Sequence, residues 1–267
     1  DDDDVVHSWV HTAGVVAEDA IHAKADTGDV KTDDQVAVKA HIYAKRKRWE
    51  EQSRALGAQR YRITCVSRVE GKGTWVVGKK GDTEVFYTPE QVKDMIEMLS
   101  AKNAQGYDIY VTPVDSSKHY FLLDDLKKEQ VDNVVKAGFE PALVLESSKD
   151  NFQVLIVCDR VVEDPNDAEL EDAAAKRVLD MLKRKFEADK NVNLNQPFRM
   201  AGFNNKKQAR NNFIVKIHDW SEKTDPRVRK AIDELKPSMK VQDHDVKPRK
   251  QKDSSVQRHE VSQDILQ

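Results

Sequence analysis

The stretch YFLLDDLKKEQ, residues 120–130, contains the change of pattern that decides the fold. Four apolar or aromatic residues lead directly into two adjacent carboxylates, Asp124 and Asp125, and a polar helical pattern follows. Such an apolar run predicts a buried strand that presents carboxylates at the rim of a sheet. Successive side chains of a regular strand point to opposite faces, so both carboxylates reach one site only if the strand twists or breaks there. The switch to LKKEQ allows such a break.

Strand-like and helix-like segments alternate on both sides of this stretch. Strands are predicted at residues 60–68, 71–80, 107–114, 120–125, 141–148, 151–160 and 212–220. Helices are predicted at residues 35–56, 88–106, 126–138, 164–190 and 225–236. This order predicts an α+β fold with one central, mostly antiparallel sheet flanked by helices.

The composition places this core between two polar segments. Charged residues make up 34% of the 267 residues and hydrophobic ones 39%, which is typical of a globular protein with polar tails. We expect an acidic N-terminal segment at residues 1–34 that joins an upstream domain, a folded domain at residues 35–236, and a disordered polar tail at residues 237–267.

The sequence also bears on where the protein works. No run approaches the roughly 18 apolar residues that a membrane span needs. The chain does not begin with Met and has no basic segment before an apolar one, which predicts a piece of a longer protein and excludes a signal peptide. Cys65 and Cys158 each lie in an apolar run and are predicted to be buried thiols of a cytoplasmic protein.

The charge is unevenly distributed although the net charge is only −3. Residues 199–216 carry five basic side chains and no acidic one. These basic residues are Arg199, Lys206, Lys207, Arg210 and Lys216. A local basic patch on a mildly acidic chain predicts a specific anionic ligand.

Four segments together resemble a known family. They are AKNAQGYDIYVTPVDSSKHYFLLDDL (101–126), GFEPALVLESSKDNFQVLIV (138–157), KRKFEADK (183–190) and FRMAGFNNKK (198–207). In order and spacing they resemble the catalytic domain of RepB-type plasmid DNA primases, which are sometimes fused to a MobA relaxase. The resemblance spans roughly residues 45–216 and implies an archaeo-eukaryotic primase-like fold. The segment NVNLNQPF (191–198) departs from the small and basic residues that the family has there.

The resemblance implies a metal site. Asp124 and Asp125 match the paired metal-binding aspartates of the family, and Asp189 matches its third acidic residue. Mg²⁺ or Mn²⁺ is the implied cofactor, because hard divalent ions take oxygen ligands. Two such ions, roughly 3.5–4 Å apart, hold the attacking and leaving oxygens of a phosphoryl transfer. Without the resemblance, Asp189 reads as a solvated acid near a helix end.

Other residues are candidates for binding the nucleotide or the DNA. Ser148, Asn151 and Gln153, with Ser147, offer hydrogen bonds to phosphates, although SSKDN is equally typical of a hairpin turn whose side chains are satisfied locally. The guanidinium of Arg199 matches the oxygens of a triphosphate. The remaining candidates, for the template backbone or the nucleotide, are Asn204, Lys206 and Lys207.

Three further features are expected to be structural. His119 is interpreted as a structural or surface histidine. Tyr110 and Phe203 could stack on bases, but core packing is the favoured interpretation of both. The run KRKR at residues 45–48 is interpreted as the solvated face of a helix.

The resemblance favours a DNA primase that makes short primers from nucleoside triphosphates on single-stranded plasmid DNA. A relaxase domain in the same polypeptide is a further expected partner. The alternative is a catalytically idle primase-like domain that binds single-stranded DNA or a partner within a conjugative relaxase. A nuclease that uses the same carboxylates ranks lower, because no histidine or lysine is placed beside the acids in the way expected for activating a water.

Overall fold

Two antiparallel sheets form the frame of the domain in the computed structural model, which describes residues 33–244. The first sheet has the strand order β2-β1-β3-β7 and the second the order β4-β6-β5-β8. The strands of the first sheet are β1 (Arg60–Ser67), β2 (Thr74–Val76), β3 (Tyr107–Val114) and β7 (Phe198–Arg199). Those of the second are β4 (Lys118–Leu126), β5 (Leu143–Ser148), β6 (Asn151–Asp159) and β8 (Lys216–Trp220).

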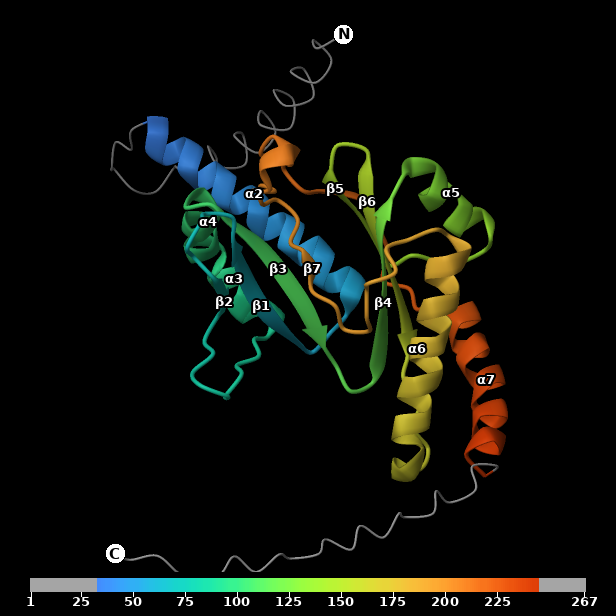
Figure 1. Cartoon of the computed structure of the whole chain (residues 1–267). Helices are drawn as coiled ribbons and strands as arrows, with labels where there is room; N and C mark the ends of the chain where they lie inside the picture. Colours follow the sequence, from blue (N-terminus) through green and yellow to red (C-terminus); the bar gives the residue numbers. More distant parts are fainter. Residues whose placement is uncertain (1–32, 245–267) are drawn as a thin grey trace, which may run out of the picture.

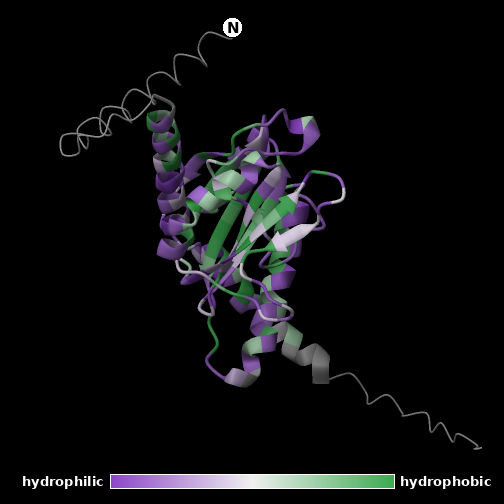
Figure 2. Cartoon of the chain, turned by 90° about the vertical axis from the view of Figure 1, so that its left-hand side faces the viewer, coloured by the Kyte–Doolittle hydropathy of each residue, from purple (hydrophilic) through white to green (hydrophobic). Residues whose placement is uncertain are grey.

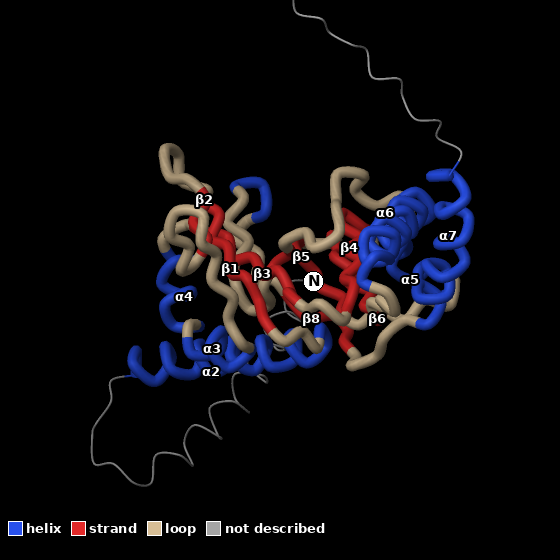
Figure 3. The backbone as a smooth tube through the Cα atoms, turned by 90° about the horizontal axis from the view of Figure 1, so that it is seen from below, coloured by secondary structure: helices blue, strands red, loops and turns tan. Residues whose placement is uncertain are grey.

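Helices cover both sheets (Figure 1). They are α2 (Asp33–Leu56), α3 (Pro89–Asp94), α4 (Ile96–Ala104), α5 (Lys128–Lys136), α6 (Ala168–Lys185) and α7 (Pro226–His244), with short 3-10 turns η1 (Pro165–Asp167) and η2 (Gln208–Arg210). Seen from below, α2, α3 and α4 lie on one side of the molecule and α5, α6 and α7 beside the second sheet (Figure 3).

The α+β class, the antiparallel pairing and the flanking helices are as predicted, but the strands form two sheets instead of one central sheet. The strands β3 and β4 follow each other across a short turn, yet β3 pairs with β1 and β7 while β4 pairs with β6. The turn is fixed by Asp115, whose carboxylate accepts hydrogen bonds from Ser117 and from the backbone N–H of Gln59. The chain therefore changes sheets at this turn.

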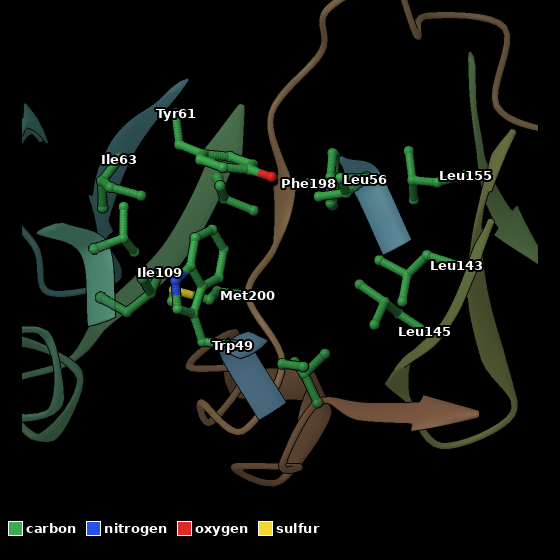
Figure 4. Packing of buried hydrophobic residues seen from close by; sticks show 14 of the residues in the cluster. Trp49, Leu56, Tyr61, Ile63, Ile109, Leu143, Leu145, Leu155, Phe198 and Met200 are labelled. Carbon is green, nitrogen blue, oxygen red and sulfur yellow. The ribbon is translucent and has the colours of Figure 1, made fainter. Parts of the chain in front are cut away.

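Helix α2 joins the two sheets through one apolar core (Figure 4). Trp49 packs edge-on against Tyr61 of β1, with ring centroids 4.9 Å apart, and its indole N–H donates to the carbonyl of Pro89 at 2.8 Å. Leu56, at the end of the helix, belongs to the same core as Leu143 and Leu155 of the second sheet. Burial of large apolar side chains from α2 and from both sheets fixes how the sheets pack against each other.

The other face of the second sheet packs against α5, α6 and α7. Phe121, Leu123 and Val154 alternate with residues of the first core along β4 and β6, as strand geometry requires. Their partners on α6 and α7 include Leu179 and Ile232. The hydropathy colouring shows the apolar strands inside and polar helix surfaces outside (Figure 2).

Several predicted element boundaries differ from the structure. The predicted helix at residues 88–106 is divided into α3 and α4 at Met95. The last helix continues through Pro237 to His244, past the predicted end at residue 236. Residues 1–32 of the predicted acidic segment (1–34) and residues 245–267 of the predicted disordered tail (237–267) lie outside the described residues, whereas residues 237–244 of that tail are helical and belong to α7.

Glu171 of α6 forms a buried ionic cluster that joins α6, α7 and β4. Its carboxylate accepts hydrogen bonds from Arg229 at 2.5 and 3.1 Å and from Lys236 at 2.7 Å. His119 Nε2 lies 3.1 Å from the same carboxylate. The side chain of Glu171 is fully buried, so these partners replace its hydration. His119 thus has the structural role that the sequence predicts.

This cluster makes the stability of the domain sensitive to acid. Burial opposes ionisation of Glu171, but the hydrogen bonds from Arg229 and Lys236 outweigh it and lower its pKa from 4.5 to about 2. A depressed folded-state pKa adds stability that is present above the unfolded-state pKa and lost as the pH falls towards the folded-state pKa. We expect the stability difference between the wild type and Glu171→Gln to shrink between about pH 4.5 and pH 2, in urea titrations at each pH. A pH-independent difference would contradict this.

Two predictions about buried residues are confirmed. Cys65 and Cys158 are buried free thiols, and burial raises their pKa to about 11 and about 12. Phe203 is a core residue, 1% exposed. Within residues 33–244, no helix combines the length and apolar character needed to cross a membrane.

Candidate active site

The strand β4 breaks at the two aspartates. Its register with β6 shifts between Leu123 and Leu126, so Asp124 and Asp125 lie in an irregular segment. Asp125 has a φ of 59°, a left-handed conformation that aspartate tolerates better than most residues. Its backbone N–H donates to Oδ1 of Asp124 at 2.8 Å. The break required for both carboxylates to reach one site is therefore present.

Asp124 lies at the contact of three segments. Its side chain accepts a hydrogen bond from Gln153 of β6, and its backbone carbonyl accepts from the N–H of Asp189 at 3.0 Å. Burial raises the pKa of Asp124 above its usual range, and the charges of Asp125 and Asp189 raise it further. The hydrogen bonds from Gln153 and Asp125 lower this pKa but do not offset the increase. Like charges near a half-buried carboxylate favour a bound cation or proton.

The other two acids are each held by an asparagine. Nδ2 of Asn151, the first residue of β6, donates to Oδ1 of Asp125 at 3.0 Å. Asn191 donates to Oδ1 of Asp189 through its backbone N–H at 2.9 Å and through Nδ2 at 3.1 Å. These contacts orient the carboxylates from the segments that follow β5 and α6.

The acids fit a hard divalent ion by their donor chemistry. Within residues 33–244, no three carboxylate, histidine or cysteine side chains form a ready cage for a metal. Mg²⁺ does not need one, because it usually takes one or two protein carboxylates and completes its shell with water and phosphate. Asp124 and Asp125, adjacent in the chain, offer carboxylate oxygens of the kind that such an ion takes.

The hairpin between β5 and β6 brings the serines to this end of the sheet. The hydroxyl of Ser147 donates to the carbonyl of Asn151 at 3.2 Å, which is the local satisfaction expected of a turn. Oγ of Ser148 is buried and has no hydrogen-bond partner within the described residues. Unpaired buried hydroxyls are costly, but Ser148 is only 2% exposed, so a ligand would reach this hydroxyl only after a local rearrangement of the turn.

The conformation of Asp125 permits a test that separates strain from charge. We expect Asp125→Asn to keep the melting temperature, because asparagine also tolerates positive φ and its oxygen can accept from Asn151. Asp125→Val places a β-branched residue there and should lower the free energy of unfolding by about 1–3 kcal/mol. Urea denaturation checks both variants, and equal stability of the two would contradict the assigned conformation.

The cationic side of the site consists of Arg199, Lys206 and Lys207, and Arg199 is connected to Asp124 through Gln153. Oε1 of Gln153 accepts the backbone N–H of Arg199 at 3.1 Å, so this residue connects the arginine to Asp124. The guanidinium of Arg199 is bidentate on Asp108 of β3, at 2.8 and 3.3 Å. It also stacks on Tyr110, 5.1 Å from the ring centroid. A direct contact of Arg199 with triphosphate, which stays a prediction, would require exchange of this ion pair.

The segment after Arg199 carries the remaining candidates. Nδ2 of Asn204 donates to the carbonyl of Asn212, and Nζ of Lys206 donates to the side chain of Asn212 at 2.6 Å. Lys207 is exposed. The pKa of Lys45 is lowered by burial and by the charge of Lys206. The KRKR run is therefore only partly a solvated face, because Lys45 lies over the ring of Phe203, a contact hidden from the sequence.

Four buried side chains that the sequence did not single out fix this segment. Gln52 of α2 bonds the backbone of residues 199 and 201, and Asn103 of α4 bonds the backbone of Asn204 in both directions. Asn205 donates to the carbonyl of Ser147 at 2.8 Å. Asp108, the fourth, receives Arg199 and the N–H of Lys206. Asn103 belongs to the NAQG motif, and Asp108 is a lone charge in an apolar strand, which are the signals that could have pointed to them.

The chain matches known proteins over most of this domain. The family model of the RepB DNA-primase N-terminal domain matches residues 50–240. A DNA primase of Acidithiobacillus ferrooxidans is 31% identical over 163 residues, which are 60% of this chain and 45% of the relative. Mobilization protein A of Escherichia coli is 30% identical over 158 residues, 58% of this chain and 20% of that protein. The chain thus spans less than half the length of these relatives.

Solved structures show the same fold. The catalytic domain of primase RepB′ in complex with initiator DNA superposes with a TM-score of 0.62 at 22% identity, over 76% of this chain and 99% of that one. Primase RepB′ gives a TM-score of 0.59 at 24% identity, over 75% and 66%. With the family match over residues 50–240, the chain belongs to the RepB DNA-primase N-terminal domain family.

Proposed function

We propose that this domain is a DNA primase that makes short primers from nucleoside triphosphates on single-stranded plasmid DNA. The observation that carries the proposal is the contact of three separated segments at the break in β4. There Asp124 bonds Gln153 through its side chain and the segment of Asp189 through its backbone. A carboxylate group on one side and a cationic group on the other suit a reaction between a primer end and a triphosphate.

The chemistry is nucleotidyl transfer. The primer 3′-hydroxyl attacks the α-phosphorus of the incoming nucleotide, the new P–O bond forms, and pyrophosphate leaves. Asp124, Asp125 and Asp189 would hold Mg²⁺ or Mn²⁺, in the two-metal arrangement typical of such transfers, and the ions would supply charge neutralisation on the transferring phosphoryl group. Little other acid–base chemistry is needed, because positioning dominates phosphoryl transfer.

The other residues of the site bind the phosphates and orient the carboxylates. Gln153 and Asn151 hold Asp124 and Asp125 in place. Ser148 has an unpaired hydroxyl that could donate to a phosphate oxygen once the turn rearranges to expose it. Lys206 and Lys207 supply positive charge that attracts the triphosphate or the template backbone, and Asn204 offers an amide beside them. Arg199 would join them only if its ion pair with Asp108 were exchanged.

The relatives support a wider setting for the domain. The match to Mobilization protein A covers a fifth of that protein, which supports a domain that works within a longer mobilisation protein, and the family resemblance adds a relaxase domain to that polypeptide. We include this arrangement in the proposal.

Primer formation from labelled nucleotides on single-stranded DNA, with Mg²⁺ or Mn²⁺, tests the proposal. The expected result is a ladder of short products that requires both the metal and the template. Metal-independent binding of single strands without any product would contradict the proposal and favour an idle binding module. Degradation of the template would favour a nuclease instead.

A further inference from the structure

Arg199 is the buried member of an ionic cluster on the first sheet. Its side chain is 5% exposed, and both of its Nη atoms bond the carboxylate of Asp108. Its aromatic neighbour Tyr110 covers one face of the guanidinium. Little of Arg199 therefore remains for a ligand.

Asp108 also accepts a hydrogen bond from a second arginine. Arg68, directly after β1, donates from Nε to Oδ2 of Asp108 at 2.5 Å. The N–H of Lys206 donates to Oδ1 at 2.6 Å, so both oxygens of Asp108 are occupied. Two guanidinium groups share one carboxylate, which leaves the cluster with one uncompensated positive charge. The hydrogen bonds and charge of Arg199, together with the contacts of Lys206 and Arg68, outweigh burial and hold the pKa of Asp108 below its usual range.

Arg68 is the exposed member of the cluster. Its side chain is 30% exposed, six times the fraction of Arg199. Nε bonds Asp108 and Nη2 bonds the hydroxyl of Tyr110 at 3.2 Å, and Nη1 has no acceptor within residues 33–244. Its backbone N–H donates to the carbonyl of Gly106 at 3.0 Å. The guanidinium is thus held at two points, and the backbone of Arg68 at a third, while one amino group stays free within the described residues.

The cluster is connected to the acids of the site. Arg199 donates its backbone N–H to Gln153, and Gln153 bonds the carboxylate of Asp124. An anion bound at the cluster would therefore lie on the cationic side of the same site. An oriented guanidinium with excess positive charge is suited to a phosphate group.

We propose that Arg68 is a phosphate-binding residue of this site, and that Asp108 positions it while neutralising the buried Arg199. The proposal deepens the primase function and rests on it. The phosphate belongs either to the nucleotide or to the DNA backbone, which share this chemistry.

Binding measurements without catalysis test Arg68 directly. Wild type, Arg68→Ala and Arg62→Ala are titrated with inorganic tripolyphosphate by calorimetry and with a labelled single-stranded oligonucleotide by fluorescence anisotropy. Arg62 is the matched control, since it lies on β1, is 28% exposed and has its own partner in Glu84. Arg68→Ala leaves the Arg199–Asp108 pair intact, so the variant should stay folded.

We expect Arg68→Ala to lower the affinity for one of the two ligands at least about tenfold. Arg62→Ala should lower the affinity for that ligand less than about twofold. Loss of tripolyphosphate affinity assigns the residue to the nucleotide, and loss of oligonucleotide affinity assigns it to the DNA backbone. Equal effects of both variants, or no effect of Arg68→Ala, would overturn the proposal. A wild type that makes no primers would refute the primase function without changing this comparison.

Two variants separate orientation from charge. Arg68→Lys keeps the charge and loses the fork, and Tyr110→Phe removes the acceptor of Nη2. Both should show a loss intermediate between wild type and Arg68→Ala, in affinity for the ligand that Arg68→Ala affects and in the KM for that ligand, nucleotide or DNA, with kcat little changed. Full affinity in both variants would show that orientation by the cluster has no role and would overturn the positioning part of the proposal.

Discussion

Asp124→Asn is expected to lower the rate of primer synthesis by about a hundred- to a thousandfold, the usual effect of removing a group that stabilises transition-state charge. The substitution keeps the shape and can still accept the N–H of Asp125. It removes the charge that lies closest to the contact of the three segments. Single-turnover primer extension with Mg²⁺ measures the effect on the chemical step.

A matched control separates this effect from general charge. Asp132→Asn removes a carboxylate from the neighbouring helix α5, where it is exposed and pairs with Lys128. We expect this variant to retain wild-type activity and both proteins to show the wild-type melting temperature. A similar loss in both variants, or full activity of Asp124→Asn, would contradict the assignment of the site.

Glu171→Gln is expected to cost about 3–5 kcal/mol of folding free energy, the usual result of breaking a buried ionic cluster from one side. The change leaves Lys236 and Arg229 without their buried counter-charge, although Arg229 keeps Asp233. Because the cluster joins α7 to α6 and β4, the loss should affect the second core. Urea denaturation followed by far-ultraviolet circular dichroism measures it.

Asp172, the residue next to Glu171, provides a control for this stability measurement. Asp172 pairs with Arg160, and its side chain is 53% exposed. Ion pairs this exposed contribute about 0–1 kcal/mol, so Asp172→Asn should change stability little. A cost for Glu171→Gln no larger than that for Asp172→Asn would show that the buried cluster does not stabilise the helix packing.

The break in the strand at the two aspartates could be predicted because its signal is local, whereas the metal-binding role of Asp124, Asp125 and Asp189 comes from the family resemblance and stays a prediction. The apolar run before Asp124 and Asp125 and the polar pattern after them already indicated a strand that ends in a break. In the structure, the left-handed conformation of Asp125 lies at this break. The α+β class could also be predicted, since it depends on the order of strands and helices along the chain.

The partners of the cationic side could not be predicted, because they are distant in the sequence. Arg199 reads as a free basic residue in an acid-free stretch, yet its partner Asp108 lies 91 positions earlier. The division into two sheets has the same origin, since it depends on which strands pair. Pattern and propensity describe single segments and do not decide between such pairings.

Direct binding of Mn²⁺, measured by electron paramagnetic resonance, tests the central claim most simply. We expect the wild type to bind the ion, and Asp124→Asn to weaken binding at least about tenfold, since even groups that only support metal ligands cost that much. Asp132→Asn should bind as the wild type does. Equal Mn²⁺ affinity in the wild type and Asp124→Asn would contradict a metal site at the break in β4.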